Sequence, residues 1–342
     1  MIAVAPIRQW NIFQMYVKNA FLNGDLHEEV YMSPPPGIQH QAGEDGFFLS
    51  LYVDDMIITG DDHGGIDSFE HDLAHRFAMK DLGLLHYFLG IEVAQSKKGY
   101  HLSQTKYISD LFTRACLFEN RSVDTPLETN ARYSPTNGVS LSDPSLYHAV
   151  VGILVYLTVT HPNIAHIVHV VSQFLTAPTS VHWGVVLRIP RYLHATQFQT
   201  FLFPLMSSLE LRAYNDADWY GDCHDHKSTT GFYVFLGESL ISWKSTKQDV
   251  VSRSSTEAEY RAMVVTTCEI IWLWWLLADM GVHISSPTPL HCDNKIVIQI
   301  ANNYVFRQQT KHIEIDCHFT HHHLQLGTIS LLFVSSTLQL VI

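Results

Sequence analysis

Apolar and polar residues alternate most regularly in the last third of the chain. Residues 209–214 (LELRAY) alternate, and they predict a strand that ends just before Asp216. Residues 231–236 and 240–243 are apolar runs on either side of Gly237-Glu238-Ser239, a spacing that predicts a hairpin.

The helix that follows has clear boundary signals. Residues 255–281 open with Ser and Thr caps and an early Glu, and they close at Gly281. Residues 289–293 predict a short strand, a further helix is expected from Asn294, and residues 328–334 predict a last strand. The order of these elements predicts an α/β (α+β) fold with a mixed sheet flanked by helices.

The first third contains shorter runs. Residues 47–62 form two apolar runs around Val53-Asp54-Asp55, which predicts a tight hairpin with two carboxylates at its tip. Residues 89–95 and 99–103 predict a second strand pair, and a helix is expected directly after it. Residues 31–46 are rich in Pro and Gly and are expected to form a loop.

The middle of the chain carries little charge. Residues 125–145 are rich in Pro, Ser, Thr and Asn, as is typical of a linker, and residues 147–175 predict two packed helices broken at Pro162.

Composition narrows the class of protein. The 342 residues are 46% hydrophobic and 16% charged, which is typical of a folded globular protein. The apolar runs 149–160 and 270–282 are shorter than the roughly 20 residues that span a membrane. Residues 1–7 are too short for a signal sequence. We therefore expect no signal peptide and no transmembrane segment.

Charge and cysteine content restrict the partners and the compartment. Acidic residues outnumber basic ones by 33 to 21, so nucleic acid would have to be bound locally and not by the overall field. Five scattered cysteines without a CxxC pair predict no disulfide framework and a reducing compartment.

Two adjacent carboxylates are the first candidates for metal chemistry. Asp54 and Asp55 lie at a predicted hairpin tip, where they repel each other unless they are solvated or neutralised by a cation such as Mg²⁺. A polar turn without metal explains the same residues, because Asp is common in turns. The sequence leaves both interpretations open.

A second group of carboxylates lies at the ends of predicted elements. Its members are Asp216, Glu257 or Glu259, Asp293, and Glu314 or Asp316. Carboxylates that converge on one sheet edge could hold two Mg²⁺ ions for phosphodiester hydrolysis, and ordinary solvated acids are the alternative. Glu259 is preferred to Glu257 because residues two apart on a helix point about 200° apart, and Glu257 is placed to pair with Arg261 in solvent.

Two other features have simpler explanations. Residues 317–323 (CHFTHHH) have the i,i+4 Cys/His spacing of a zinc site, but no second ligand pair stands at a useful distance. Trp272, Trp274 and Trp275 are expected in the core and not as a base-stacking platform.

Five blocks of sequence occur in a distinctive order. They are VKNAFLNGDLHEEVYMSPPPG (17–37), LYVDDMIITGDD (51–62), FAMKDLGLLHYFLGIEV (77–93), YLTVTHPNIAHIVHVVSQFL (156–175), and a run over 216–319 with DADWYGD, STEAEYRAM, CDN and TKHIEIDCHF. Together they resemble the Pol polyprotein of copia-type LTR retrotransposons.

The resemblance implies an organisation and an activity. It implies a remnant reverse transcriptase palm over 11–120, a linker and helical connection over 121–206, and a ribonuclease H-like domain over 207–336. The family synthesises DNA on RNA and cleaves the RNA strand of RNA–DNA hybrids, both with Mg²⁺. An RNA template or a hybrid is the implied partner, without a membrane, and the cytoplasm or a virus-like particle is the implied location.

The resemblance also implies roles for individual residues. Asp54 and Asp55 match the aspartate pair of the polymerase. Asp216, Glu259 and Asp293 match the first three ribonuclease H carboxylates. Glu314 or Asp316 matches the fourth, and Glu314 is preferred.

The chain departs from the family in its polymerase part. Tyr16 stands where the family has a third aspartate, and only 14 residues separate Gly37 from Tyr52, where the family has a long stretch. We therefore expect an internally deleted copy that lacks polymerase activity and retains ribonuclease H. The alternatives are a non-catalytic protein that binds a hybrid or a protein partner, and the product of an unselected pseudogene.

Overall fold

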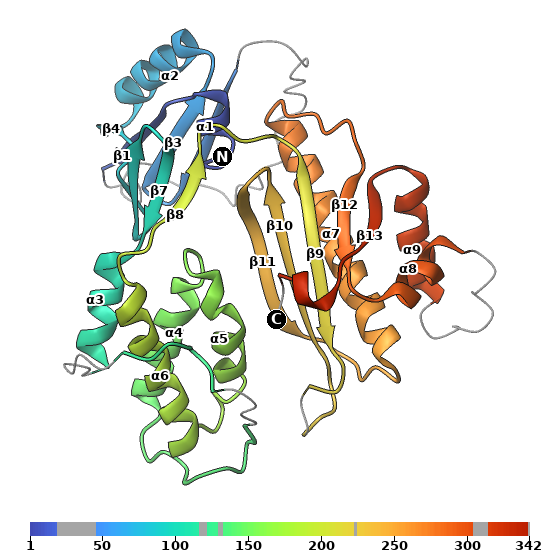
Figure 1. The fold of residues 1–342 in the computed structure, drawn as a ribbon. Helices are drawn as coiled ribbons and strands as arrows, with labels where there is room; N and C mark the ends of the chain where they lie inside the picture. Colours follow the sequence, from blue (N-terminus) through green and yellow to red (C-terminus); the bar gives the residue numbers. More distant parts are fainter. Residues whose placement is uncertain (19–45, 116–121, 129–132, 222–223, 304–313, 341–342) are drawn as a thin grey trace, which may run out of the picture.

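A computed structural model describes residues 1–18, 46–115, 122–128, 133–221, 224–303 and 314–340. Within these ranges the chain forms three sheets, the last of which is the helix-covered C-terminal sheet, and a group of helices that lies below the two N-terminal sheets in the view of Figure 1. The expected loop at 31–46 lies almost wholly outside the described residues, as do Cys116 and Cys223.

The first sheet contains the predicted hairpin with two carboxylates. Its strands are β1 (Ile12–Val17), β2 (Phe47–Tyr52), β3 (Asp55–Gly60) and β4 (Met79–Leu84), in the order β2-β3-β1-β4. β2 and β3 pair antiparallel, with Tyr52 opposite Asp55, so Val53 and Asp54 form the turn. Helix α2 (His63–Arg76) packs on one face, where Met15, Met56, Ile58 and Ile66 are buried.

The second sheet joins two distant parts of the chain. β5 (Tyr87–Phe88), β6 (Ile91–Ser96) and β7 (Gly99–Ser103) continue into β8 (Phe201–Pro204). The predicted β6–β7 pair and the helix after it, α3 (Thr105–Arg114), are confirmed. β8 lies outside every strand predicted from the sequence.

Helices form the middle of the chain. They are α4 (Ser145–Leu157), a 3-10 turn (Pro162–Ile164), α5 (Ala165–Ser172) and α6 (Ser180–Thr196), whereas the short α1 (Ala5–Arg8) lies near the N-terminus. The break at Pro162 is confirmed, because this residue begins the 3-10 turn between α4 and α5. Thr179 caps α6 through its hydroxyl, which accepts a hydrogen bond from the backbone of His182.

The C-terminal sheet is mixed, as predicted. Its strands are β9 (Leu211–Asp218), β10 (Thr229–Leu236), β11 (Ser239–Lys247), β12 (Thr288–Cys292) and β13 (Ile329–Phe333), in the order β11-β10-β9-β12-β13. β12 is parallel to both β9 and β13, whereas β10 is antiparallel to its two neighbours. The carboxyl ends of β9 and β12 therefore meet at the same edge of the sheet.

Three helices accompany this sheet: α7 (Ser255–Asp279), α8 (Lys295–Asn302) and α9 (Glu314–Gln325). Figure 1 draws α7 behind β9 and β12, and Tyr260, Met263, Ile270 and Leu273 are buried against the sheet. By length and composition alone, α7 is apolar enough to cross a bilayer. In this structure it is a core helix that packs on β9 and β10.

The fold corrects two expectations from the sequence. Asp216 lies within β9, opposite Gly231, because the ladder with β10 continues to Asp218. Trp272 and Trp275 are 52% and 68% exposed on the outer face of α7, and only Trp274 turns toward the core, where its indole donates to Thr288.

Candidate carboxylate site

Three elements bring three predicted carboxylates to one edge of the C-terminal sheet. Asp216 lies near the end of β9, Asp293 directly follows β12, and Glu259 lies in the second turn of α7. Ala217, Ala258 and Ala262 pack together, and their small side chains let α7 lie close to β9 at this point. The local sequence therefore positions Glu259 over Asp216.

Hydrogen bonds orient two of the three carboxyl groups. The backbone N–H of Ala217 donates to Asp216 over 2.8 Å. The hydroxyl of Ser336 donates to Asp293 over 2.7 Å. Sequence reasoning missed Ser336, because it is 43 residues from Asp293 and only the fold brings the two together.

The cluster concentrates negative charge in a buried place. Glu259 is 7% exposed, and its Oε2 is buried without a hydrogen-bond partner. Burial, and after it the negative charges of Asp216 and Asp293, raise the pKa of Glu259 to about 9. Burial and then Asp293 raise the pKa of Asp216. Acidic groups arranged in this way are stabilised by a bound cation.

Cys292 borders the same site. One ligand atom each from Glu259, Cys292 and Asp293 lies within 4.8 Å of the other two. Burial raises the pKa of the Cys292 thiol to about 12, so the sulfur stays protonated, and a thiol is a weaker metal ligand than a thiolate. The available donors are therefore carboxylate oxygens, which suit a hard cation such as Mg²⁺.

Glu257 is separate from the cluster. As expected, it pairs with Arg261, and the two side chains are 2.6 Å apart. The expectation that this pair lies in solvent is wrong, because the Glu257 side chain is only 3% exposed. A backbone N–H from Arg253 also donates to it over 2.8 Å.

The fourth predicted carboxylate is Glu314 or Asp316, and both residues lie in α9. Asp316 lies beside Arg261 and Glu257, whose charges lower and raise its pKa, while burial raises it most. Glu314 begins α9, and its side chain lies outside the described residues. The choice between Glu314 and Asp316 stays a prediction.

Residues 317–323 do not gather ligands for zinc. Cys317 is buried in the hydrophobic core. A ring nitrogen of His321 lies 3.3 Å from the Ala301 carbonyl, and one of His323 lies 3.4 Å from the Thr328 hydroxyl. Among the described residues, the group that could hold a metal ion is the one that contains Glu259 and Asp293.

The second candidate site contains the aspartates of the first sheet. Tyr16 on β1 lies opposite Asp55, and its hydroxyl donates to Asp54 over 3.4 Å. The negative charge of Asp54 is the largest cause that raises the pKa of Tyr16, so the phenol stays neutral. Asp54 Oδ1 is buried without a partner. A phenol thus stands beside two carboxylates at this site.

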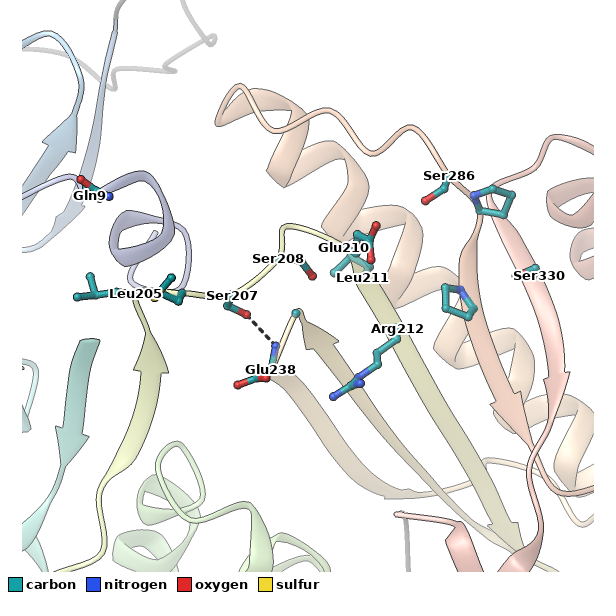
Figure 2. A pocket seen from close by; sticks show the side chains of 14 residues that line it. Gln9, Leu205, Ser207, Ser208, Glu210, Leu211, Arg212, Glu238, Ser286 and Ser330 are labelled. Atoms are coloured by element: carbon teal, nitrogen blue, oxygen red, sulfur yellow. Dashed lines mark hydrogen bonds between the residues drawn. The ribbon is translucent and has the colours of Figure 1, made fainter. Parts of the chain in front are cut away.

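Two cavities among the described residues lie away from the carboxylate cluster. The first has a volume of about 1000 Å³ and lies at the opposite end of the C-terminal sheet, where β9 begins and where β10 turns into β11; its lining side chains are drawn in Figure 2. Arg212 and Glu238 are among its lining residues, and the Glu238 backbone donates to Ser207 over 2.9 Å. A cavity of about 520 Å³ adjoins Asp55. The cluster of Asp216, Glu259 and Asp293 borders neither of them.

Comparison with known proteins places the chain among retroelement proteins. The family described as reverse transcriptase (RNA-dependent DNA polymerase) matches residues 39–129. The retrovirus-related Pol polyprotein from transposon RE2 of Arabidopsis thaliana is 36% identical over 389 residues, which cover 99% of this chain and 27% of that protein. The putative transposon Ty5-1 protein of Saccharomyces cerevisiae is 31% identical, over 75% of this chain and all of that protein.

The lengths in these comparisons differ. The chain spans about a quarter of the Arabidopsis Pol polyproteins it matches. The alignment with the first of them covers 389 residues against 342 in the chain, so at least 47 aligned positions have no counterpart here.

Two solved ribonuclease H structures also match the chain. They come from Halobacterium salinarum (14% identity, TM-score 0.25, 37% of this chain and 87% of that one) and Mycobacterium tuberculosis (12%, 0.28, 39% and 86%).

Proposed function

The chain belongs to the copia-type retrotransposon Pol family, and on that premise we propose that its C-terminal sheet domain cleaves the RNA strand of RNA–DNA hybrids. Asp216, Glu259 and Asp293 are the proposed catalytic residues. The observation that carries the proposal is their convergence from β9, α7 and β12 on one sheet edge, with a buried Glu259 oxygen that lacks a partner.

Reverse transcriptases and ribonucleases H use divalent metal ions, and we propose Mg²⁺ here, held by the same three carboxylates. Bound Mg²⁺ would stabilise charge on a phosphodiester and activate a water molecule. The chain's own contribution is to hold the carboxylates in place. Ala217 and Ser336 orient Asp216 and Asp293, while the short approach of α7 to β9 supports Glu259.

The site that contains Asp54 and Asp55 supports a proposal of lost activity. Two-metal phosphoryl transfer needs carboxylates around both ions, and here a neutral phenol from Tyr16 stands beside Asp54 and Asp55. We therefore propose that this site does not synthesise DNA. An intracellular location, in the cytoplasm or a virus-like particle, belongs to the same proposal.

A substrate panel tests the ribonuclease activity. The full chain is incubated with labelled RNA–DNA hybrid, duplex RNA and duplex DNA in the presence of Mg²⁺. We expect the chain to cleave the RNA strand of the hybrid and to leave duplex RNA and duplex DNA uncut. We expect Asp216→Asn to lose this cleavage.

The panel also separates the competing function. A chain that binds the hybrid without cutting it would act as a binding module. Cleavage that survives in Asp216→Asn would place the activity elsewhere, in the chain or in a contaminating nuclease.

A further inference from the structure

Three exposed aromatic rings lie just past the carboxyl end of β9, the strand that carries Asp216. Trp219 and Tyr220 follow directly after β9, the strand that carries Asp216, and they are 51% and 50% exposed. The Tyr220 ring stacks on exposed His226, with centroids 4.4 Å apart and planes within 8° of parallel. The Trp219 and Tyr220 centroids are 6.4 Å apart. We call Trp219, Tyr220 and His226 the aromatic ledge.

The ledge is anchored to the elements that form the site. The indole N–H of Trp219 donates to the Ser252 carbonyl over 3.1 Å, and Ser252 lies just before α7, the helix that carries Glu259. The Tyr220 N–H donates to the Ser228 hydroxyl over 3.3 Å. The polar edge of the Trp219 ring is therefore engaged, while its apolar faces stay available.

The backbone of the ledge is strained. Tyr220 and His226 have φ values of 62° and 60°, in the left-handed region that side chains with a Cβ rarely adopt. Neither position is a glycine, the residue that adopts a positive φ without strain. Strain of this kind gathers at functional sites, where it persists because the surrounding structure holds it. Here the two residues with positive φ are the ones whose exposed rings stack in parallel.

We propose that the aromatic ledge binds a nucleoside of the nucleic-acid strand whose phosphate lies on the carboxylate cluster. Aromatic rings contact nucleic acids by stacking on the flat faces of bases and by packing on sugars. The inference rests on the proposed function, because it takes the strand at Asp216 to be the ligand. It adds a substrate-binding surface outside the carboxylates.

Binding affinity is the test. The full chain binds a fluorescently labelled RNA–DNA hybrid, with Ca²⁺ in place of Mg²⁺, and affinity is read from anisotropy. Trp219→Ala and Tyr220→Gly are each expected to weaken binding by roughly 5- to 100-fold, the effect of losing one stacked aromatic. Trp275→Ala is the matched control, because Trp275 is also exposed but lies on the outer face of α7. It should bind as the native chain does.

Tyr220→Gly separates binding from folding. Glycine tolerates a positive φ, so this variant should melt no lower than the native chain while it binds more weakly. A purely structural role for Tyr220 predicts the reverse, a lower melting temperature with unchanged affinity.

Two forms of the hybrid show which part of the nucleoside contacts the ledge. If the ledge packs on a sugar, the ring variants lose the same affinity for a fully paired hybrid and for one with an unpaired end. If it stacks on a base, they lose affinity only for the hybrid with the unpaired end.

Three results would contradict nucleoside binding by the aromatic ledge. They are ring variants that bind as the native chain does, an equal loss of binding in Trp275→Ala, and a native chain that does not bind the hybrid.

The proposed ribonuclease activity can fail separately. Weaker binding by the ring variants, together with no cleavage by the native chain in Mg²⁺, would contradict the ribonuclease activity and still support nucleoside binding by the ledge.

Discussion

Two glutamates of α7, only two residues apart, have opposite environments. Glu259 faces Asp216 and Asp293, whereas Glu257 pairs with Arg261 over 2.6 Å. Without metal, Glu259→Gln should raise the free energy of unfolding at pH 7 by about 1–3 kcal/mol, because the amide removes the cost of an acid buried among acids. Denaturant unfolding in the presence of a chelator measures this change.

The same substitution at Glu257 is the matched control. Glu257→Gln should lower the free energy of unfolding by about 3 kcal/mol, because it leaves the Arg261 charge without its buried partner. Added Mg²⁺ should stabilise the native chain and Glu257→Gln, and it should stabilise Glu259→Gln less. Equal changes of the same sign in both variants would contradict the assignment of Glu259 to the metal site.

Tyr16 gives a second prediction at this scale. Neither the native chain nor Tyr16→Asp should extend a primer on an RNA template with Mg²⁺ or Mn²⁺. In the native chain a phenol replaces one carboxylate, and the variant still has only 14 residues between Gly37 and Tyr52. Gel analysis of primer length measures the result. Extension by the native chain, above a control with Asp54 and Asp55 both changed to Asn, would contradict it.

The preference for Glu259 shows what a single sequence can resolve. Helix periodicity separated Glu259 from Glu257, and the ion pair of Glu257 with Arg261 was expected from their spacing. The burial of that pair was not predictable, because it depends on how α9 and the segment before α7 pack around it. The contact of Ser336 with Asp293 likewise depends on the tertiary fold.

At the scale of elements, α5 is joined to β11 through histidines. The backbone N–H of Lys247 donates to His169 Nε2 over 3.1 Å, so this nitrogen must be unprotonated. A ring nitrogen of His166 lies 3.1 Å from the Ser245 hydroxyl.

Burial lowers the pKa of both histidine rings. The pKa of His169 is also lowered by His166, Lys247 and Lys244. Facing groups also include Gln173 and Asp225, both bonded to the Lys247 ammonium.

This contact should weaken in acid. A histidine with a lowered pKa in the folded state contributes stability that is complete above its ordinary pKa of 6.5 and is lost as pH falls below it. Each histidine can contribute a slope of up to about 1.4 kcal/mol per pH unit. His169→Gln keeps an acceptor for the Lys247 N–H and removes the titration.

Unfolding free energies of the native chain and His169→Gln, measured from pH 7.5 down to about pH 5, test this prediction. The native chain should lose more stability than the variant over that window. Parallel curves would show that the histidine contact does not control the acid response.

Elements with a clear pattern were predictable, and elements without one were not. The hairpin of β10 and β11, the strand β12 and the bounds of α7 follow from alternation, turn residues and caps. The exposure of Trp272 and Trp275 does not, because α7 is apolar on nearly every side and periodicity does not mark its buried face. Asp216 was placed after its strand, because the sequence does not show how far the ladder with β10 extends.

At the scale of the whole molecule, distant segments complete the C-terminal core. Val4 is 1% exposed and packs in the same cluster as Leu211, Phe232 and Leu290. Val4→Ala should therefore destabilise the C-terminal sheet domain by about 2 kcal/mol, although it lies outside the predicted unit 207–336. Denaturant unfolding measures the change, and Val139→Ala, at a 76% exposed position, is the control. Equal stability of both variants would contradict this packing.

The most direct test of the proposed ribonuclease site is the rate at which the full chain cleaves the RNA strand of an RNA–DNA hybrid with Mg²⁺. Three proteins are compared: the native chain, Asp293→Asn, and Asp249→Asn, which makes the same charge change at an exposed position. We predict that Asp293→Asn slows cleavage by about a hundred-fold or more, while Asp249→Asn cleaves like the native chain. Equal rates for Asp293→Asn and the native chain, or no cleavage by the native chain, would contradict it.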